Sequence, residues 1–299
     1  HGIFTTGGSN SNQMGFMCAR EDALPGSSAT GLNGQNLRAF ASAEAHYSVD
    51  SAANMMGIGT DSLIRIPCIN GKMDPQALDE KIIQEKQNGN LPFIILSTAG
   101  TTVRGSFDDL NAISEIAQKH GIWHHVDAAW GGAALFSNKH RNLLNGIEKA
   151  DSFAFDAHKM IGSSMVCSAF IVQDESILPN TMSHTNIGDY LFDDPNKKLS
   201  LGRISLQCGR RADALKLWFS WLELGKKGLG RRVDACIDAS EHLAHLVEKH
   251  PQLILVSFSY SNVCIRFTPQ PNETIEQGNQ RVRMVRNYLE DHAKCMVLD

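Results

Sequence analysis

Short apolar segments alternate with helix-forming segments through most of the 299-residue chain. Segments of strand character are rich in β-branched and aromatic residues and end at polar or glycine residues. They are residues 2–6, 37–42, 63–66, 93–98, 123–127, 152–155 and 166–172. Because most of them are apolar on both faces and are separated by helices, they predict a mostly parallel sheet with helices on both sides. The predicted fold class is therefore α/β.

The helical segments carry signals for their ends. Asp74 precedes a helical pattern and can cap it, and Pro75 suits the first helical position. In that helix Leu78, Ile82 and Ile83 are expected to share a face. The spacing therefore predicts a helix that begins at Pro75 and packs on the sheet.

The rest of the chain predicts loops and a second domain. Residues 26–35 are rich in Gly, Ser and Asn, and residues 179–201 are rich in Asp, Asn and Lys, so both are expected to be exposed loops. A helical pattern between Arg211 and His250 is broken near Gly225, and two strands and a helix follow it. We therefore expect a large domain over residues 1–225. Residues 226–299 should form a connecting helix and an incomplete, smaller α+β domain.

Composition narrows the classes of function. The chain has 28 Lys and Arg against 32 Asp and Glu, which are interspersed and give a formal net charge of -4, so no field favours nucleic acid or an anionic membrane. No apolar run approaches the roughly 20 residues that span a bilayer. The seven cysteines are dispersed and never in C-x-x-C spacing, so we expect a reducing, cytoplasmic compartment. Because the chain starts at His1, without Met, we expect it to be part of a longer protein.

Two glycines join the first strand to the first helix in the segment Thr-Thr-Gly-Gly-Ser-Asn-Ser-Asn, residues 5–12. Glycine lets a ligand approach the backbone, and a helix amino terminus offers free N–H groups with about half a unit of positive charge. This segment predicts either a phosphate cradle or a tight turn with a Ser cap. It is not a P-loop, since no Gly-Lys-Ser/Thr follows.

A carboxylate ends one of the apolar strands. Asp127 follows His124 and His125, and a buried carboxylate needs a charged or hydrogen-bonded partner. A metal site would group these three residues. Adjacent residues of a strand point to opposite faces, however, so both histidines cannot readily bind one ion, and we expect no metal. Small residues after Asp127 indicate that something flat lies near the backbone.

Lys159 lies in an apolar run just after a strand. Lysine is seldom buried without a role, and an amine removed from water is a competent nucleophile toward an aldehyde. Taken alone, Lys159 also fits a side chain with a buried stem and a solvated head. A phosphate cradle, an acid for a pyridinium nitrogen and a reactive lysine are together the three protein groups that pyridoxal 5'-phosphate (PLP) requires.

With these motifs the sequence resembles the group II PLP-dependent amino-acid decarboxylases, which act on glutamate, cysteine sulfinate, aromatic amino acids or diaminobutyrate. The resemblance extends from about residue 2 to 249. It rests on the residues Asp-Ser-Phe and His-Lys within 151–159, His-Val-Asp-Ala-Ala-Trp at 125–130, Gly-Thr-Thr and Phe-Asp-Asp within 100–109, and Gln-Cys-Gly-Arg-Arg at 207–211. It implies fold type I of the PLP enzymes, the aspartate-aminotransferase-like fold, with PLP as cofactor.

The resemblance also implies roles for the residues that would hold the cofactor. Lys159 would bind PLP covalently as a Schiff base, and Asp127 would pair with the ring nitrogen. Gly8 and Ser9 fall where the family binds the phosphate, and His158 would reach it as well.

Further roles concern the cofactor ring and the substrate. His46 would stack on one face of the ring, and Ala129 would lie under the other. Thr102 would lie near the phenolic oxygen and the substrate, and Arg210 matches the arginine that receives the substrate carboxylate. Tyr190 matches the mobile-loop tyrosine that protonates the substrate carbon. His46, Tyr190 and Arg210 also have ordinary structural interpretations, as a helix cap, an exposed aromatic and a partner of a neighbouring carboxylate.

The function implied is decarboxylation of an L-amino acid to an amine and carbon dioxide. The segment around Arg210 favours an acidic substrate: glutamate, aspartate or cysteine sulfinate. The first residues resemble diaminobutyrate decarboxylases at least as well, so L-2,4-diaminobutyrate is an alternative. An aminotransferase or another fold type I reaction, and a non-catalytic scaffold, are further alternatives. The family also implies a homodimer with active sites at the interface.

Overall fold

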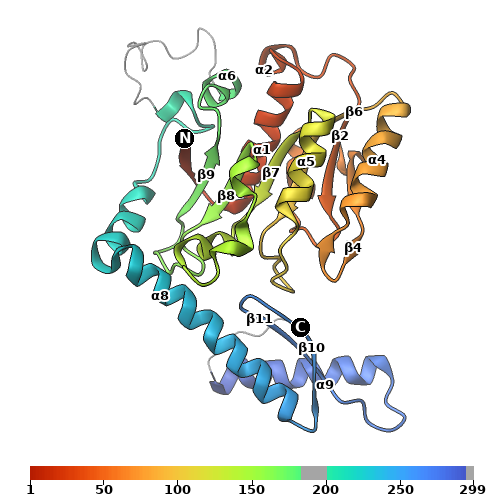
Figure 1. Cartoon of the computed structure of the whole chain (residues 1–299), viewed down its shortest axis with the longest axis vertical. Coiled ribbons are helices and arrows are strands. Elements are labelled where there is room, and N and C mark those ends of the chain that lie inside the picture. The colour runs from red at the N-terminus through yellow and green to blue at the C-terminus, as the bar shows by residue number, and fades with distance from the viewer. Residues whose placement is uncertain (183–200, 294–299) are drawn as a thin grey trace. The chain divides into compact units, whose positions relative to one another are not determined.

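The computed structural model describes residues 1–182 and 201–293, and the chain divides into two compact units, His1–Ala235 and Cys236–Asp299. A seven-stranded sheet forms the centre of the first unit (Figure 1). Its strands lie in the order β1 (Gly2–Thr5), β9 (Ser168–Val172), β8 (Ser152–Asp156), β7 (Trp123–Asp127), β6 (Leu91–Thr98), β2 (Leu37–Ser42) and β3 (Leu63–Ile66).

One strand of this sheet runs against the others. β9 is antiparallel to both of its neighbours, β1 and β8, whereas the pairs from β8 through β3 are parallel. β1 therefore runs in the same direction as β8, β7 and β6. The mostly parallel α/β sheet predicted from the sequence is confirmed, with each strand near its expected range.

Helices and short connecting elements complete the first unit. The α-helices are α1 (Gly8–Ala23), α2 (Ser27–Thr30), α3 (Ser48–Met55), α4 (Pro75–Gln87), α5 (Leu110–His120), α6 (Ile177–Met182) and α8 (Asp213–Lys249), which continues into the second unit. Short helical turns are η1 (Thr60–Ser62), η2 (Gly131–Phe136), η3 (Arg141–Leu144), η4 (Ile147–Lys149) and η5 (Leu201–Arg203), and β4 (Cys68–Ile69) pairs with β5 (Lys72–Met73).

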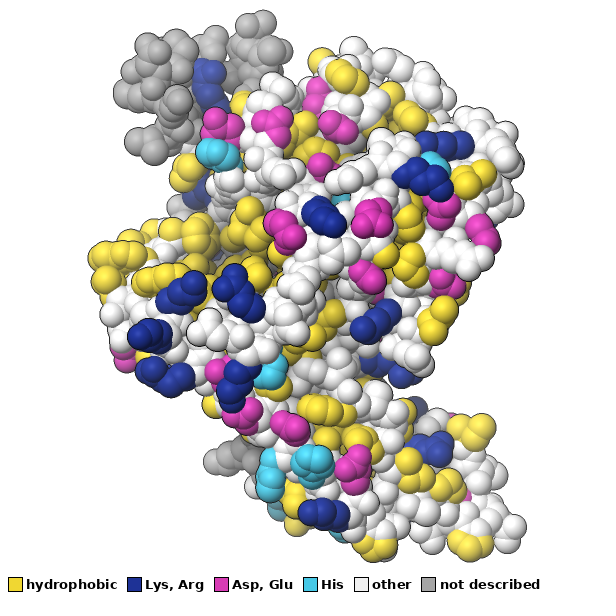
Figure 2. Space-filling view, viewed as in Figure 1, with side chains coloured by type: hydrophobic (Ala, Val, Ile, Leu, Met, Phe, Trp, Pro, Cys, Tyr) yellow, Lys and Arg dark blue, Asp and Glu magenta, His cyan; other side chains and the backbone are white. Residues whose placement is uncertain are grey.

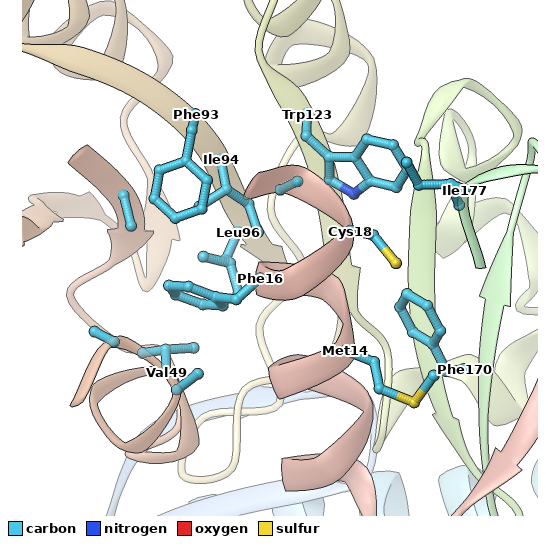
Figure 3. Packing of buried hydrophobic residues seen from close by; sticks show 14 of the residues in the cluster. Met14, Phe16, Cys18, Val49, Phe93, Ile94, Leu96, Trp123, Phe170 and Ile177 are labelled. Carbon is cyan, nitrogen blue, oxygen red and sulfur yellow. The ribbon is translucent and has the colours of Figure 1, made fainter. Parts of the chain in front are cut away.

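Both faces of the sheet are covered, because alternate residues of a strand point to opposite sides. In β6, Ile94 and Leu96 pack in the cluster that contains α1 and α3, whereas Ile95 packs in the cluster that contains α4 and α5. Figure 3 shows the first cluster, where the rings of Phe16 and Phe93 meet edge to face with centroids 5.8 Å apart. The fully apolar strands thus reflect burial on two sides.

The end signals of α4 act as expected, and α5 ends at a glycine in the same way that many helices do. The Asp74 carboxylate accepts the backbone N–H of Gln76 at 2.9 Å, and Pro75 begins the helix. Gly121 ends α5 with φ 64°, a left-handed conformation that favours glycine. The expected apolar face of α4 is partly wrong, because Leu78 and Ile82 are buried but Ile83 is 39% exposed.

The predicted loop over residues 26–35 contains the single helical turn α2. The turn forms because the Glu21 carboxylate accepts the N–H groups of Gly26 and Ser28 and the hydroxyl of Ser27. Residues 179–182, expected at the start of a loop, belong to α6. Local hydrogen bonding thus orders segments whose composition is typical of loops.

The helix α8 has the predicted break at Gly225, whose φ of 60° and ψ of 175° are not helical. The second unit begins at Cys236, eleven residues after Gly225, and the boundary expected at residues 225 and 226 stays a prediction. This unit contains the antiparallel strands β10 (Leu253–Ser259) and β11 (Asn262–Phe267), the helix α9 (Ile275–Tyr288) and the π-helical turn η6 (Leu289–Ala293). Arg281 of α9 lies over the Phe267 ring, 5.0 Å from its centroid.

In the described ranges, 1–182 and 201–293, no helix has the length and apolar character needed to cross a bilayer.

Gly15 lets α1 approach the sheet closely. A Cβ atom at this position would lie 2.9 Å from Nδ1 of His125 in β7. We expect Gly15→Ala to lower the free energy of unfolding by about 1–3 kcal/mol, because the buried ring must shift. Urea unfolding measures the loss. Gly209→Ala is the control, since its Cβ would meet no heavy atom within 4 Å. Equal unfolding midpoints for both variants would contradict the close approach.

Candidate active site

The carboxyl ends of β1, β6, β7 and β8 meet at one edge of the sheet, because these strands run in the same direction. A cavity of about 210 Å³ lies at this edge. Its lining consists of Gly8, Ser9, Asn12, His46, Ser48, Thr98, Gly100, Thr102, Asp127, Ala129, Trp130, Asp156, His158 and Lys159. The structure therefore brings together every residue that was expected to contact the cofactor.

Two of the expected residues are not part of this lining. The Arg210 guanidinium donates a hydrogen bond to the backbone carbonyl of Phe4 in β1, and burial lowers the pKa of Arg210. Tyr190 lies outside the described residues. Their roles stay predictions.

The amino terminus of α1 opens into the cavity. Gly7 precedes the helix with φ 137°, which favours glycine, and no side chain of the described residues caps the helix. A Cβ on Gly8 would lie 2.9 Å from Oδ2 of Asp156, so only glycine fits there. Thr5 and Ser11 join the strand to the helix through hydroxyls 2.7 Å apart. The alternative, a turn capped by Ser, does not form. The first backbone amides of α1 are therefore available to bind an anion.

The Asp127 carboxylate is 8% exposed and receives a donor on each oxygen. Oδ1 accepts the backbone N–H of Ala129 at 3.1 Å, and Oδ2 accepts the Asn12 amide at 2.8 Å. Each oxygen keeps a further lone pair for a ligand. The partner that a buried carboxylate needs is thus an amide rather than a cation.

The two histidines of β7 point to opposite faces, as expected. His124 lies 2.7 Å from the Ser97 hydroxyl and 2.9 Å from that of Ser114. His125 lies 2.8 Å from the Ser152 hydroxyl and 3.0 Å from the Asn12 oxygen. Within the residues that the structure describes, no group of three His, Cys, Asp or Glu is placed to hold a metal ion.

His46 lines the cavity and is held by Ser48. Its Nδ1 is 2.9 Å from the Ser48 hydroxyl and accepts the Ser48 backbone N–H at 3.2 Å. Burial lowers the pKa of His46, while Asp127 acts in the opposite direction. The ring therefore tends to be neutral, which suits stacking on a flat ligand.

Lys159 forms an ion pair at the end of β8. Its Nζ lies 3.0 Å from Oδ2 of Asp156, which is 2% exposed, and Nε2 of His158 lies 3.9 Å from the same oxygen. Among the described residues, the other carboxylate oxygen of Asp156 is buried without a hydrogen-bond partner. The Lys159 side chain is 38% exposed, so its head is reachable from the cavity.

Asp108 and Asp109 of the Phe-Asp-Asp segment have structural roles beside the cavity. Its carboxylate accepts the backbone N–H groups of Met73 and Thr98, both at 2.7 Å, and so fixes the end of β6 beside the cavity. Burial raises the pKa of Asp108 to about 6. Asp109 caps α5 by accepting the N–H of Ala112 at 3.1 Å. These two carboxylates shape the site without lining it.

Asn12 and Ser48 line the cavity but were not expected there. Asn12 follows Gly8 by four residues, so helical periodicity would have placed both on one face of α1. Ser48 follows His46 by two residues at the start of α3 and carries no separate signal in the sequence.

Comparison with known proteins decides the family. The model of the pyridoxal-dependent decarboxylase conserved domain matches residues 1–268. The chain belongs to the pyridoxal-dependent decarboxylase family. The fold type I architecture and the PLP cofactor predicted from the sequence agree with this family.

Similar decarboxylases include two curated relatives and a crystal structure. The acidic amino acid decarboxylase GADL1 of Bos taurus is 40% identical over 93% of this chain and 54% of its own. The cysteine sulfinic acid decarboxylase of Mus musculus is 40% identical over 90% of this chain and 55% of its own. The structure of mouse CSAD in apo form has a TM-score of 0.90 and 34% identity, covering 99% of this chain and 64% of that chain. The chain spans about half the length of these curated relatives.

The residues of this chain fit the cofactor. The uncapped end of α1 offers amide donors to a phosphate, and the Lys159 amine reaches the same cavity. Asp127 keeps lone pairs that can accept a hydrogen bond from a ring nitrogen. Oδ1 of Asp156 has no hydrogen-bond partner among the described residues and can accept one from a ligand.

The buried histidines predict a loss of stability on acidification. Burial lowers the pKa of His124 to about 3 from its usual 6.5. Below pH 6.5 the unfolded chain therefore binds a proton that the folded chain does not, and stability falls with pH. Between pH 7.5 and 5.5 we expect wild type to lose about 1.4 kcal/mol more than His124→Asn. Urea unfolding at both pH values measures this, and parallel losses in the two proteins would refute it.

Proposed function

We propose that this chain carries the cofactor-binding catalytic part of an enzyme that decarboxylates an acidic L-amino acid. The supporting observation is that Lys159, Asp127 and the open end of α1 line one cavity. These three features match the aldehyde, the ring nitrogen and the phosphate of PLP.

Different residues bind different parts of the cofactor. Lys159 holds PLP covalently through its amine, and Asp127 keeps the ring nitrogen protonated. Gly8, Ser9 and His158 bind the phosphate at the amino terminus of α1. Their positions around the cavity support these assignments.

The cofactor ring and the substrate depend on further residues. His46 and Ala129 would hold the ring from its two faces, and Thr102 would lie near the substrate. That all three line the cavity supports these roles. When bound, PLP accepts the electron pair that is released as the bond to the carboxylate breaks. Tyr190 delivers a proton to the substrate carbon that has lost the carboxylate. It also helps to exclude water from the site, and this exclusion prevents the side reaction of transamination.

An acidic amino acid is the proposed substrate class: glutamate, aspartate or cysteine sulfinate. The names of the two curated relatives and the segment Gln-Cys-Gly-Arg-Arg support it. Arg210 receives the substrate carboxylate. Its hydrogen bond to Phe4, just before the glycines that lead into α1, supports a position close to the cavity.

Carbon dioxide release tests the function. The PLP-loaded protein is expected to absorb in the visible range and to convert at least one acidic amino acid to an amine and carbon dioxide. Lys159→Ala should abolish both the covalent cofactor absorbance and turnover, because no other side-chain amine lines the cavity within the described part of the chain. Glutamate, aspartate, cysteine sulfinate, L-2,4-diaminobutyrate and aromatic amino acids form the screen.

Three results would contradict the proposal. If diaminobutyrate were the only amino acid to release carbon dioxide, the proposed acidic substrate class would be wrong. A keto acid instead of an amine would indicate an aminotransferase. Unchanged absorbance in Lys159→Ala, or no absorbance in wild type, would favour a non-catalytic protein.

A second copy of the chain is the proposed partner, as the family implies. Hydrophobic side chains gather over the amino-terminal part of α8 (Figure 2). This apolar surface consists of Leu215, Trp218, Phe219, Trp221 and Leu222, which are 42–61% exposed. A hollow of about 610 Å³ lined by Phe4, Phe136, Phe155 and Trp221 adjoins it. Exposed patches of this kind are typical of protein interfaces.

Mass measurement in solution tests the homodimer. We expect a dimer for wild type and a monomer for Phe219→Glu, since a charge placed in an apolar interface is costly. Ile275→Glu is the matched control, because Ile275 is exposed but lies in the second unit. A monomeric wild type, or a dimeric Phe219→Glu, would show that α8 does not form the interface.

We also propose a cytoplasmic location. The described cysteines are free thiols, which supports a reducing compartment.

A further inference from the structure

The side chain of Asn12 uses all of its hydrogen-bonding groups inside the first unit. It is 1% exposed and lies in α1, one turn beyond Gly8. Its amide nitrogen lies 2.8 Å from Oδ2 of Asp127 and 2.9 Å from Oγ of Ser48. Its oxygen lies 3.0 Å from Nε2 of His125. An amide has two donor hydrogens and one acceptor oxygen, so each group meets a partner.

The Asp127 carboxylate sets the direction of these hydrogen bonds. An ionised carboxylate can only accept, so the Asn12 nitrogen faces Asp127 and its oxygen faces His125. His125 therefore carries its proton on Nε2 and accepts with Nδ1 from the Ser152 hydroxyl at 2.8 Å. That hydroxyl accepts the indole N–H of Trp123, which can only donate, at 2.8 Å. Every donor in this chain of bonds points toward Asp127.

A second branch leads from Asn12 to His46. Because the Ser48 hydroxyl accepts from Asn12, its own hydrogen is free to go to Nδ1 of His46 at 2.9 Å. The Ser48 backbone N–H also donates to this nitrogen. In the neutral ring the proton therefore lies on Nε2. The orientation of His46 thus depends on the same amide as the orientation of Asp127.

We propose that Asn12 is a positioning residue that holds the Asp127 carboxylate and, through Ser48, the His46 ring in one arrangement. The proposal rests on the proposed function, in which Asp127 meets the ring nitrogen and His46 meets the ring face. Without Asn12, the donor that remains to Asp127 among the described contacts is the Ala129 N–H on Oδ1. Oδ2 then has no donor from the described residues, and the carboxylate is free to turn.

Two substitutions test this role. Asn12→Leu keeps the size but removes all three hydrogen bonds, and Asn12→Asp keeps an acceptor for His125 but removes both donors. In the PLP-loaded protein we expect kcat to fall about 10- to 100-fold, the loss typical of a hydrogen bond to a charged group. KM for the best acidic substrate should change little. The pH dependence of the bound cofactor's visible absorbance should shift, because Asp127 no longer holds the ring nitrogen.

Ser114→Ala is the control for loss of stability alone. It removes a buried hydrogen bond to His124 on the other face of β7, 2.9 Å long, and leaves the Asn12 contacts intact. It should lower the unfolding temperature but keep the kcat and the absorbance of wild type. Ser48→Ala breaks only the His46 branch and should lower kcat about 3- to 10-fold, which tests the inference even if the Asn12 variants do not fold.

Wild-type kcat and absorbance in the Asn12 and Ser48 variants would overturn the inference. An equal loss of kcat in Ser114→Ala would also overturn it, since the effect would then reflect stability. A wild-type protein that binds no PLP and releases no carbon dioxide would instead refute the proposed function.

Discussion

A carboxylate at the end of a fully buried strand must be solvated by the protein. Moving such a group out of water without partners costs at least several kcal/mol, so donors have to be built around it. In this chain Asp127 obtains them from the turn that follows β7, through the Ala129 N–H, and from α1, through Asn12. Satisfying this one charge therefore ties the first helix to the centre of the sheet. The cavity forms where these elements meet.

The reversed strand β9 contributes to the same result. By lying antiparallel between β1 and β8, it lets β1 run in the direction of β8, β7 and β6. The turn after β1 then reaches the edge at which Asp127 and Asp156 end their strands. Glycines at positions 7 and 8 allow the chain to pass close to Asp156 and to enter α1 without a side-chain cap.

Much of the fold could be predicted because strand and helix periods are local properties of a sequence. The strand at 123–127, the cap at Asp74 and the break at Gly225 are examples. Those site residues that belong to a sequence motif could also be predicted. Helical spacing places Asn12 on the Gly8 face of α1, but its hydrogen bonds could not be predicted, because its partners Asp127 and Ser48 lie 115 and 36 residues away in the sequence. Ile83 was placed wrongly because helical spacing alone does not show how wide the buried face is.

The helix α1 contributes to both ends of the cavity, since Gly8 lies at its start and Asn12 stands one turn further. A helix rises about 1.5 Å per residue, so four residues separate these two points by about 6 Å along its axis. This length cannot be changed without breaking backbone hydrogen bonds. The helix therefore fixes the separation between its first amides and the Asn12 side chain that holds the Asp127 carboxylate.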